Sequence, residues 1–388
     1  MLIHKNKLVR IVTTPISFEK LLTGQLYFMS NYYNVCAISS DKIQLEEFAK
    51  PEGISTYSVN LTRKITPLKD LIALWRLYKF FRFEKPLIVH THTPKAGLLG
   101  MIAARAAGTR IRLHTVAGLP LMEASGLKKR VLKVTEKITY ACATKVYPNS
   151  FGLKDIIINY KFCSPEKLKI IGNGSSNGVD VSYFDPGLIT EKIKKDTRES
   201  LNIKEDAFLY LYVGRIVGDK GVNELVEAFS KLYEIDNTIK LLLVGYREAE
   251  LDQLKQKTEE IISSHPAIIS TGYQKDVRAF YAISNTLVLP SYREGFPNVL
   301  MQAGAMGLFC ITTDINGCNE IIEDKKNGLI VPPKDKDSLF NAMADVLSQR
   351  GKRGAYNNAA RHMVCEKYNS SIIWNALLEE YKNFEENV

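Results

Sequence analysis

Short apolar runs rich in Val and Ile alternate with helical periods along the whole chain. Each run ends at turn-forming residues, and the intervening segments carry apolar residues three and four positions apart. This alternation is typical of buried parallel strands covered by helices. In the first half, the predicted strands are residues 8–12, 35–39, 87–90, 110–116, 145–148 and 169–171.

The second half repeats the same theme. Its predicted strands are residues 208–213, 240–244, 268–270, 286–289, 309–313 and 329–331. We therefore expect an α/β fold with two doubly wound domains, which place their ligand outside the carboxyl ends of the strands. Residues 172–178 are too rich in Gly, Asn and Ser for an element interior and suit a hinge. The expected domains are 1–178, 179–365 and a C-terminal helix over 366–388 that packs back across the domain interface.

A surface helix is predicted over residues 67–83. Pro67 suits its first turn, and five bulky apolar residues recur at helical spacing. We expect the helix to bury one face, made of Leu68, Leu71, Ile72, Trp75 and Tyr78.

Composition excludes several classes of protein. With 45% hydrophobic and 24% charged residues among 388, the chain is an ordinary globular protein and not a disordered one. No apolar run approaches the roughly 18 residues that a transmembrane helix needs. The N-terminus lacks the apolar core of a secretory signal. The six cysteines are scattered without CxxC spacing, so we expect reduced thiols and a cytoplasmic protein.

The positive charge is concentrated in the first half. Residues 1–180 hold 27 basic and 12 acidic side chains, whereas residues 181–388 hold 25 and 30, so the net charge of +10 arises entirely before residue 181. Such an uneven field suits nucleic acid, an anionic membrane surface or a phosphorylated substrate.

A glycine turn with two cations follows the predicted strand 208–213. Residues 214–221 read GRIVGDKG and lead into a helix. Glycines let the backbone approach a ligand, and a helix start offers amide donors. With Arg215 and Lys220 beside Gly214, the turn suits a diphosphate; solvated cations on an ordinary loop are the alternative.

A second candidate site follows the predicted strand 286–289. Residues 290–305 read PSYREGFPNVLMQAGA, and the helix should start near Pro297. Glu294 precedes that helix and Gln302 lies inside it, so the two can contact different parts of one elongated ligand. Sugar hydroxyls and phosphate are the groups that such a carboxylate, amide and helix start bind; a helix cap with a surface glutamate is the alternative.

Taken in order, these motifs resemble the retaining glycosyltransferases of family 4, which have the GT-B fold of two facing Rossmann-like domains with a cleft between them. Residues 177–180 with Phe184, 317–322 and 327–332 match as well. Residues 90–97 and 114–120 look like a bacterial branch that builds capsule, O-antigen and other glycans on lipid carriers.

The resemblance implies a donor half-site in the second domain. A hexose or N-acetylhexosamine would pass from a UDP-sugar with retained configuration and without a required metal or cofactor. Arg215 and Lys220 would neutralise the leaving diphosphate, Glu294 would hold the donor sugar, and the base would lie near Gly245. The other implied donor contacts are Gly214, Gly272, Tyr273, Gly295, Phe296, Pro297, Asn298, Val299 and Gln302.

Two positions depart from the family pattern. Gln302 stands where the family usually has a second glutamate, so it would bind ribose rather than act as a base. Ala117 stands where the family often has a histidine, and His114 precedes it by three residues, which strand alternation turns to the opposite face.

The resemblance also implies an acceptor half-site in the first domain, with a polyprenyl-diphosphate-linked saccharide as the acceptor. Its candidate residues are His92, Lys95 and His114. His90 and His92 could suggest zinc, but no third ligand follows at suitable spacing, which favours core or cleft histidines.

Residues 126–133 alternate cations with apolar residues at helical spacing. A solvated helix face is one interpretation, and peripheral contact with the inner face of the cell membrane is the other.

A nonhydrolysing sugar-nucleotide epimerase and a noncatalytic nucleic-acid-binding module are the rival functions. The first would need acidic acid/base residues in the cleft, and no nucleic-acid-binding motif supports the second.

Overall fold

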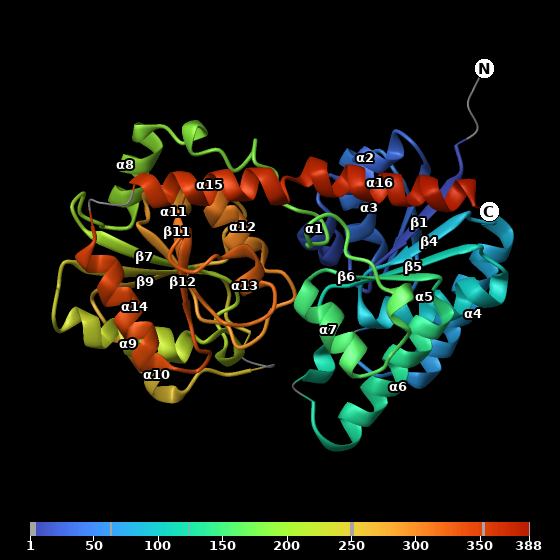
Figure 1. Cartoon of the computed structure of the whole chain (residues 1–388), viewed down its shortest axis with the longest axis horizontal. Helices are drawn as coiled ribbons and strands as arrows, with labels where there is room; N and C mark the ends of the chain where they lie inside the picture. Colours follow the sequence, from blue (N-terminus) through green and yellow to red (C-terminus); the bar gives the residue numbers. More distant parts are fainter. Residues whose placement is uncertain (1–4, 63, 123, 249–251, 351–353, 388) are drawn as a thin grey trace. The chain divides into compact units, whose positions relative to one another are not determined.

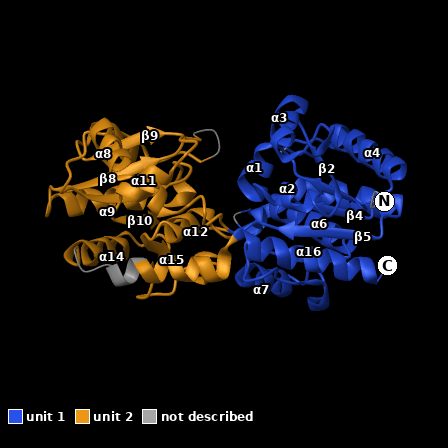
Figure 2. Cartoon of the chain, turned by 90° about the horizontal axis from the view of Figure 1, so that it is seen from above, with its two compact units in different colours: residues 1–178, 370–388 blue, residues 179–369 orange. Residues whose placement is uncertain are grey.

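The computed structural model divides into two compact units (Figure 2). It describes residues 5–62, 64–122, 124–248, 252–350 and 354–387. Unit 1 comprises Met1–Gly178 and Ser370–Val388, and unit 2 comprises Val179–Asn369. The chain therefore passes between the units twice, after Gly178 and after Asn369.

Unit 1 is built on a six-stranded parallel sheet in the order β3-β2-β1-β4-β5-β6. This is the doubly wound order in which the sequence of strands reverses beside β1. The predicted strand at 169–171 is wrong, because the chain there makes only a single bridge, between Val146 and Leu168. The prediction also missed β3, whose short polar sequence carries no apolar run. The strands are β1 (Lys7–Ile11), β2 (Asn34–Ser39), β3 (Ser55–Ser58), β4 (Ile88–Thr91), β5 (Ile111–Val116) and β6 (Lys145–Pro148).

Helices cover both faces of this sheet (Figure 1). One layer consists of α4 (Pro67–Glu84), α5 (Pro94–Ala107), α6 (Gly126–Cys142) and α7 (Phe151–Asn159). The other consists of α1 (Ile16–Leu22), α2 (Gln25–Ser30), α3 (Lys42–Glu52) and the C-terminal α16 (Ser370–Glu386).

The predicted buried face of α4 is wrong. The helix exists and begins at Pro67, but it packs through Ala73, Leu77 and Phe81. The bulkier residues that we expected to be buried lie on its outer side and are exposed, namely Leu68, Leu71, Ile72, Trp75 and Tyr78. Both sides of α4 carry apolar residues, so periodicity alone could not say which side the sheet covers.

Helix α16 belongs to unit 1. Ile373, Leu377 and Tyr381 enter the apolar core beneath it. The glycine-rich segment 172–178 is tied to the same unit, since Trp374 Nε1 donates to Asn177 Oδ1 over 2.7 Å and Gln25 donates to Ser176 O over 3.0 Å. The C-terminal helix thus begins four residues later than the expected 366.

Unit 2 has its own six-stranded parallel sheet, in the order β12-β11-β10-β7-β8-β9, around one apolar core. All six of its predicted strands are present. They are β7 (Phe208–Val213), β8 (Ile239–Val244), β9 (Ile268–Gly272), β10 (Thr286–Leu289), β11 (Phe309–Thr313) and β12 (Gly328–Val331). The helices are α8 (Glu191–Ser200), α9 (Val222–Tyr233), α10 (Gln256–Ser264), α11 (Arg278–Ile283), α12 (Asn298–Ala305), α13 (Cys318–Ile321), α14 (Lys336–Ser348) and α15 (Gly354–Tyr368).

Candidate functional site

The loops after β7 and β10 lie against each other at the carboxyl edge of the unit 2 sheet, because these strands are neighbours. Gly221 makes the approach possible. Its φ is +70°, and a Cβ there would stand 2.0 Å from the Pro290 carbonyl oxygen, so only glycine fits. Tyr292 N also donates to Asp219 O over 2.9 Å. Two motifs about 70 residues apart in the sequence thus form one site.

Lys220 and Glu294 form an ion pair across these two loops. Lys220 Nζ donates to Glu294 Oε1 over 2.6 Å, and Ser291 Oγ donates to the same oxygen over 2.8 Å. Both charged side chains are only 15% exposed. The pair therefore lies in a partly desolvated position, where an anionic ligand could take the place of the carboxylate beside the ammonium group.

Arg215 is also held by carboxylates. It donates to Glu248 Oε2 over 2.8 Å and lies 3.8 Å from Asp219 Oδ2. Burial acts to lower the pKa of Arg215, but the hydrogen bond to Glu248 and the charge of Asp219 outweigh it, so the pKa is raised. Arg293 shares Asp219 at 3.1 Å. The loop after β7 therefore presents fixed cations, partly neutralised by acidic neighbours.

A third loop, after β11, braces the Glu294 segment. Asn316 Nδ2 donates to Glu294 O over 2.6 Å. Gly317 has φ +78°, and a Cβ there would stand 2.3 Å from the Gly295 carbonyl oxygen. Sequence reasoning missed Asn316 and Ser291. Ser291 could have been found, because it is a polar residue two positions after a buried strand.

Helix α12 begins beside this loop without a side-chain cap, because its N-cap is Pro297. Amides at such a start attract anions. Phe296 anchors the turn by packing edge-on against Tyr368, with ring centroids 5.3 Å apart. Gln302 lies inside α12, where its Oε1 accepts from Tyr281 OH over 3.1 Å. Gly295 follows Glu294 in the loop, and Asn298 and Val299 are the first two residues of α12.

The ends of β8 and β9 lie side by side on the other flank of β7. Gly245 N donates to Gly272 O over 2.9 Å, and Gly214 N donates to Val244 O. Tyr273 is 60% exposed, and the centroid of its ring lies 6.3 Å from the centroid of the Tyr246 ring. An exposed aromatic ring beside open backbone suits a nucleobase.

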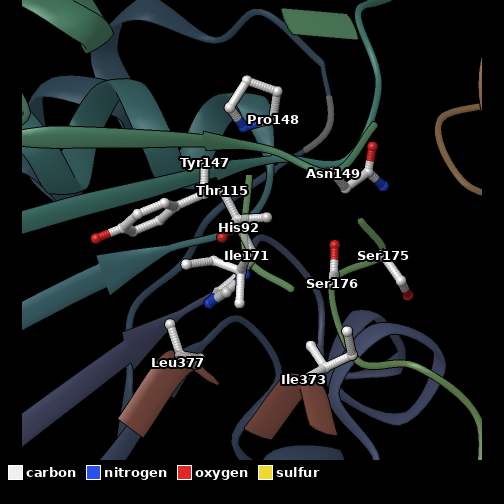
Figure 3. Close-up of a pocket in the computed structure, with 10 residues that line it drawn as sticks. All are labelled: His92, Thr115, Tyr147, Pro148, Asn149, Ile171, Ser175, Ser176, Ile373 and Leu377. Atoms are coloured by element: carbon white, nitrogen blue, oxygen red, sulfur yellow. The ribbon is translucent and has the colours of Figure 1, made fainter. Parts of the chain in front are cut away.

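Unit 1 holds a small pocket, with both polar and apolar lining residues, at the ends of β4, β5 and β6 (Figure 3). His92 Nδ1, Asn149 Oδ1 and Ser176 Oγ are buried there and have no hydrogen-bond partner within the described part of the chain. Ile171, Ile373 and Leu377 form its apolar wall. The pocket can therefore take a small polar group that both donates and accepts.

The tautomer of His92 follows from its neighbour. Arg10 is fully buried, and its Nε donates to His92 Nε2 over 3.0 Å, so the imidazole proton is on Nδ1, the nitrogen without a partner in the described chain. Arg10 also donates to Tyr381 OH over 3.1 Å. Burial, reinforced by the charge of Arg10, holds the pKa of His92 well below 6.5, so the ring is neutral at pH 7. Burial does the same to the pKa of His90.

The other two acceptor-side candidates have structural partners. His114 Nδ1 bonds Thr91 Oγ1 over 2.8 Å, and its buried ring lies so close beneath α5 that a Cβ at Gly97 would stand 2.5 Å from it. Burial lowers its pKa to about 4. His114 therefore belongs to the core, because strand alternation turns it toward the helix layer. Lys95 donates to both Asp70 oxygens over 2.8 Å and joins α5 to α4.

Among the residues that the structure describes, no group of three or more His, Cys, Asp or Glu side chains is placed to hold a metal ion. Nor does the described chain include a helix with the length and apolar character needed to cross a bilayer.

Comparison with known proteins gives matches in both units. Residues 193–363 match the family model "Glycosyl transferases group 1", and residues 31–174 match "Glycosyl transferase 4-like domain". The chain is 32% identical over 379 residues to the capsular polysaccharide biosynthesis glycosyltransferase CapM of Staphylococcus aureus, covering 97% of each chain.

Two further matches are a second curated relative and a solved structure. The chain is 32% identical over 324 residues to the UDP-Gal:alpha-D-GlcNAc-diphosphoundecaprenol alpha-1,3-galactosyltransferase of Escherichia coli, covering 82% of this chain and 81% of the relative. The crystal structure of Anabaena HepE in complex with UDP superimposes with a TM-score of 0.81 at 16% identity, covering 98% of this chain and 100% of HepE.

Proposed function

We propose a specific reaction for this chain, which belongs to the family of glycosyltransferases with the GT-B fold, of the type that assembles capsules and lipid-linked sugars. In this reaction, a hexose or N-acetylhexosamine passes from a UDP-sugar to a polyprenyl-diphosphate-linked saccharide. We propose further that the anomeric configuration is retained. The observation that carries the proposal is the pairing of Lys220 with Glu294, beside Arg215, in the unit 2 site.

Arg215 and Lys220 act on the leaving diphosphate. Negative charge develops on that group as the bond to the sugar breaks, and fixed cations in a partly desolvated site stabilise charge that builds in the transition state. Without ligand, Lys220 and Arg215 are paired with the carboxylates of Glu294 and Glu248. These carboxylates hold the two cations in position, and the diphosphate replaces them when it binds. Since two cations and the start of α12 supply the positive charge, we propose that no metal ion is required.

Glu294 serves the donor sugar. When the diphosphate engages Lys220, Glu294 keeps its bond from Ser291 and is free to accept from sugar hydroxyls. Gln302 is held by Tyr281 and binds the ribose without adding charge. Tyr273 is the proposed surface for the uracil ring. The support for uridine is the donor named for the Escherichia coli relative and the UDP bound to HepE.

The acceptor contact that we propose in unit 1 is the pocket of His92, Asn149 and Ser176. A sugar hydroxyl can accept from His92 Nδ1, and Asn149 Oδ1 can accept from a second hydroxyl of the acceptor. A lipid-linked acceptor also requires that the enzyme work at a membrane surface. We therefore propose peripheral attachment to the cytoplasmic face of the cell membrane, with no role for nucleic acid.

A thermal-shift panel tests the donor assignment. UDP, GDP, ADP and their common sugars are added to the whole protein with and without magnesium, because a ligand that binds the folded state raises Tm by mass action. We expect uridine nucleotides to stabilise without metal. Stabilisation by GDP or ADP alone would overturn the uridine assignment, and no response to any nucleotide would overturn the donor site.

Product analysis tests the reaction itself. With a UDP-sugar and a short-chain lipid diphosphate saccharide, NMR of the product should show the donor's anomeric configuration. Inversion would contradict retention. Conversion of the UDP-sugar to its epimer without any acceptor would indicate the rival epimerase.

A further inference from the structure

The outer face of α4 carries large apolar side chains that no described residue of unit 1 covers. Leu68 is 79% exposed, Leu71 62% and Trp75 56%. At 100° per residue they share one side of the helix with Ile72 and Tyr78, opposite the buried Ala73, Leu77 and Phe81. One apolar side of α4 is thus packed against the core of unit 1, and the other apolar side is exposed and can bind a partner.

The charge on the outside of α4 is entirely positive. Lys69, Arg76, Lys79 and Arg82 are exposed among the apolar residues. Lys79 Nζ lies over the Trp75 ring, 3.8 Å from its centroid. The two carboxylates of α4 are neutralised within the unit, because Asp70 pairs with Lys95 and Glu84 pairs with Lys7.

Helix α6 has the same construction. Leu127 is 76% exposed, and Val131, Val134 and Ile138 continue its line at spacings of three and four. Lys128, Arg130 and Lys137 lie exposed on the two flanks of that line. The carboxylate of α6, Glu136, is buried, and burial raises its pKa to about 7.

Both apolar lines point away from the sheet. Helices α4 and α6 lie in one layer, on either side of α5 and in contact with it (Figure 1). Each turns its opposite side to the apolar core that the layer shares. Together, α4, α5 and α6 carry 11 cations and 3 carboxylates, none of which is a free surface acid.

We propose that the outer faces of α4 and α6 form a docking surface for an anionic lipid bilayer, with Trp75 and its apolar neighbours entering the headgroup region. Apolar side chains interspersed with Lys and Arg suit that interface, where long cationic side chains extend to lipid phosphates. A second copy of the chain fits less well, since it would bring two strongly positive faces together.

This inference gives the membrane attachment in the proposed function a location, and it can be tested apart from the transferase reaction. The whole protein is sedimented with phosphatidylcholine vesicles that contain or lack phosphatidylglycerol, with no donor or acceptor present. We expect binding to the anionic vesicles, weakened by salt, and a blue shift of tryptophan emission. Trp75→Phe should keep the binding and lose most of the shift.

Two double variants and their matched controls locate the surface. Leu71→Ser with Trp75→Ser should weaken binding about tenfold through lost apolar contact. Arg76→Glu with Lys79→Glu should weaken it roughly 25-fold or more, since each nearby cation contributes about fivefold. Ile235→Ser and Lys195→Glu change equally exposed residues of unit 2 and should bind like the unaltered protein.

The proposal is overturned if the protein does not bind anionic vesicles. It is also overturned if the α4 variants keep the Tm of the unaltered protein and bind these vesicles as strongly as the control variants do. A concentration-dependent dimer that the Leu71→Ser, Trp75→Ser variant abolishes would assign the face to a second copy instead. Vesicle binding without UDP binding, or the reverse, separates this inference from the proposed transferase function.

Discussion

Replacing Lys220 by alanine should affect stability and catalysis through different partners, and the two effects can be separated. In the ligand-free protein, the substitution leaves Glu294 with its bond from Ser291 but without its ammonium partner, at 15% exposure. Leaving a largely desolvated charged acceptor without its partner costs about 1–3 kcal/mol of unfolding free energy. We therefore expect Lys220→Ala to be destabilised by about 1–2 kcal/mol in urea denaturation.

The catalytic effect should be larger. A hydrogen bond to a charged group contributes about 1.5–3 kcal/mol, and in the proposed reaction the bond from Lys220 strengthens as the diphosphate departs. Its loss corresponds to a decrease in kcat/KM of roughly 10- to 150-fold. The assay is transfer from the UDP-sugar to a lipid diphosphate saccharide under single-turnover conditions.

The double variant Lys220→Ala, Glu294→Gln distinguishes the two effects. Removing the unpaired carboxylate should return at least half of the lost stability while leaving the transfer rate low. Lys231→Ala is the matched control, because its 3.1 Å pair with Asp337 is mostly exposed and should matter little to stability or rate. Unchanged kcat/KM in Lys220→Ala would refute its role at the diphosphate, and stability that Glu294→Gln fails to restore would refute the coupling.

Three further predictions follow from the same contacts. Gln302→Glu should retain activity within about threefold and keep its bond from Tyr281, since either side chain can accept it; complete loss of transfer would contradict a ribose-binding role. Gly221→Ala should cost more than about 2 kcal/mol of stability and abolish UDP-induced stabilisation, because its Cβ would collide with the loop after β10; a variant that folds and binds UDP normally would contradict this contact. Stability should also fall as pH drops below 6.5, where unfolded histidines gain protons that the buried ones cannot, at about 1.4 kcal/mol per pH unit for each. Glu136, whose raised pKa acts in the opposite direction between pH 7 and 4.5, offsets about one of them. Urea denaturation at pH 7.5, 6.5 and 5.5 should therefore show a loss of about 2 kcal/mol of unfolding free energy between pH 6.5 and 5.5, and a flat profile would contradict the burial of His90, His92 and His114.

Several features of the site could be predicted because they are local. The glycine turn at 214–221 and the start of a helix near Pro297 depend on residues a few positions apart, and both follow strands whose apolar runs are unambiguous. Asn149 and Asn316 gave no such signal. Asn316 acts through a partner distant in sequence, and Asn149 through its burial in the unit 1 pocket, so both roles became visible only in the folded chain.

The face of α4 shows where periodicity stops being informative. Spacing alone predicts an amphipathic helix, but Leu77 and Phe81 on one side and Leu68 and Trp75 on the other are both apolar. The sheet covers the first side. The more bulky side remained outside, and it forms part of the proposed lipid surface.

By itself, the sequence determined the two α/β domains and the glycine turns of the candidate site, because strand periods and glycine turns are set by neighbouring residues. The tertiary structure decided which groups meet. It paired Lys220 with Glu294, buried Arg10 against His92, returned α16 to unit 1 and placed His114 in the core. These outcomes depend on contacts between residues 23 to more than 300 positions apart, and on which of two apolar surfaces the chain covers, which no local pattern specifies.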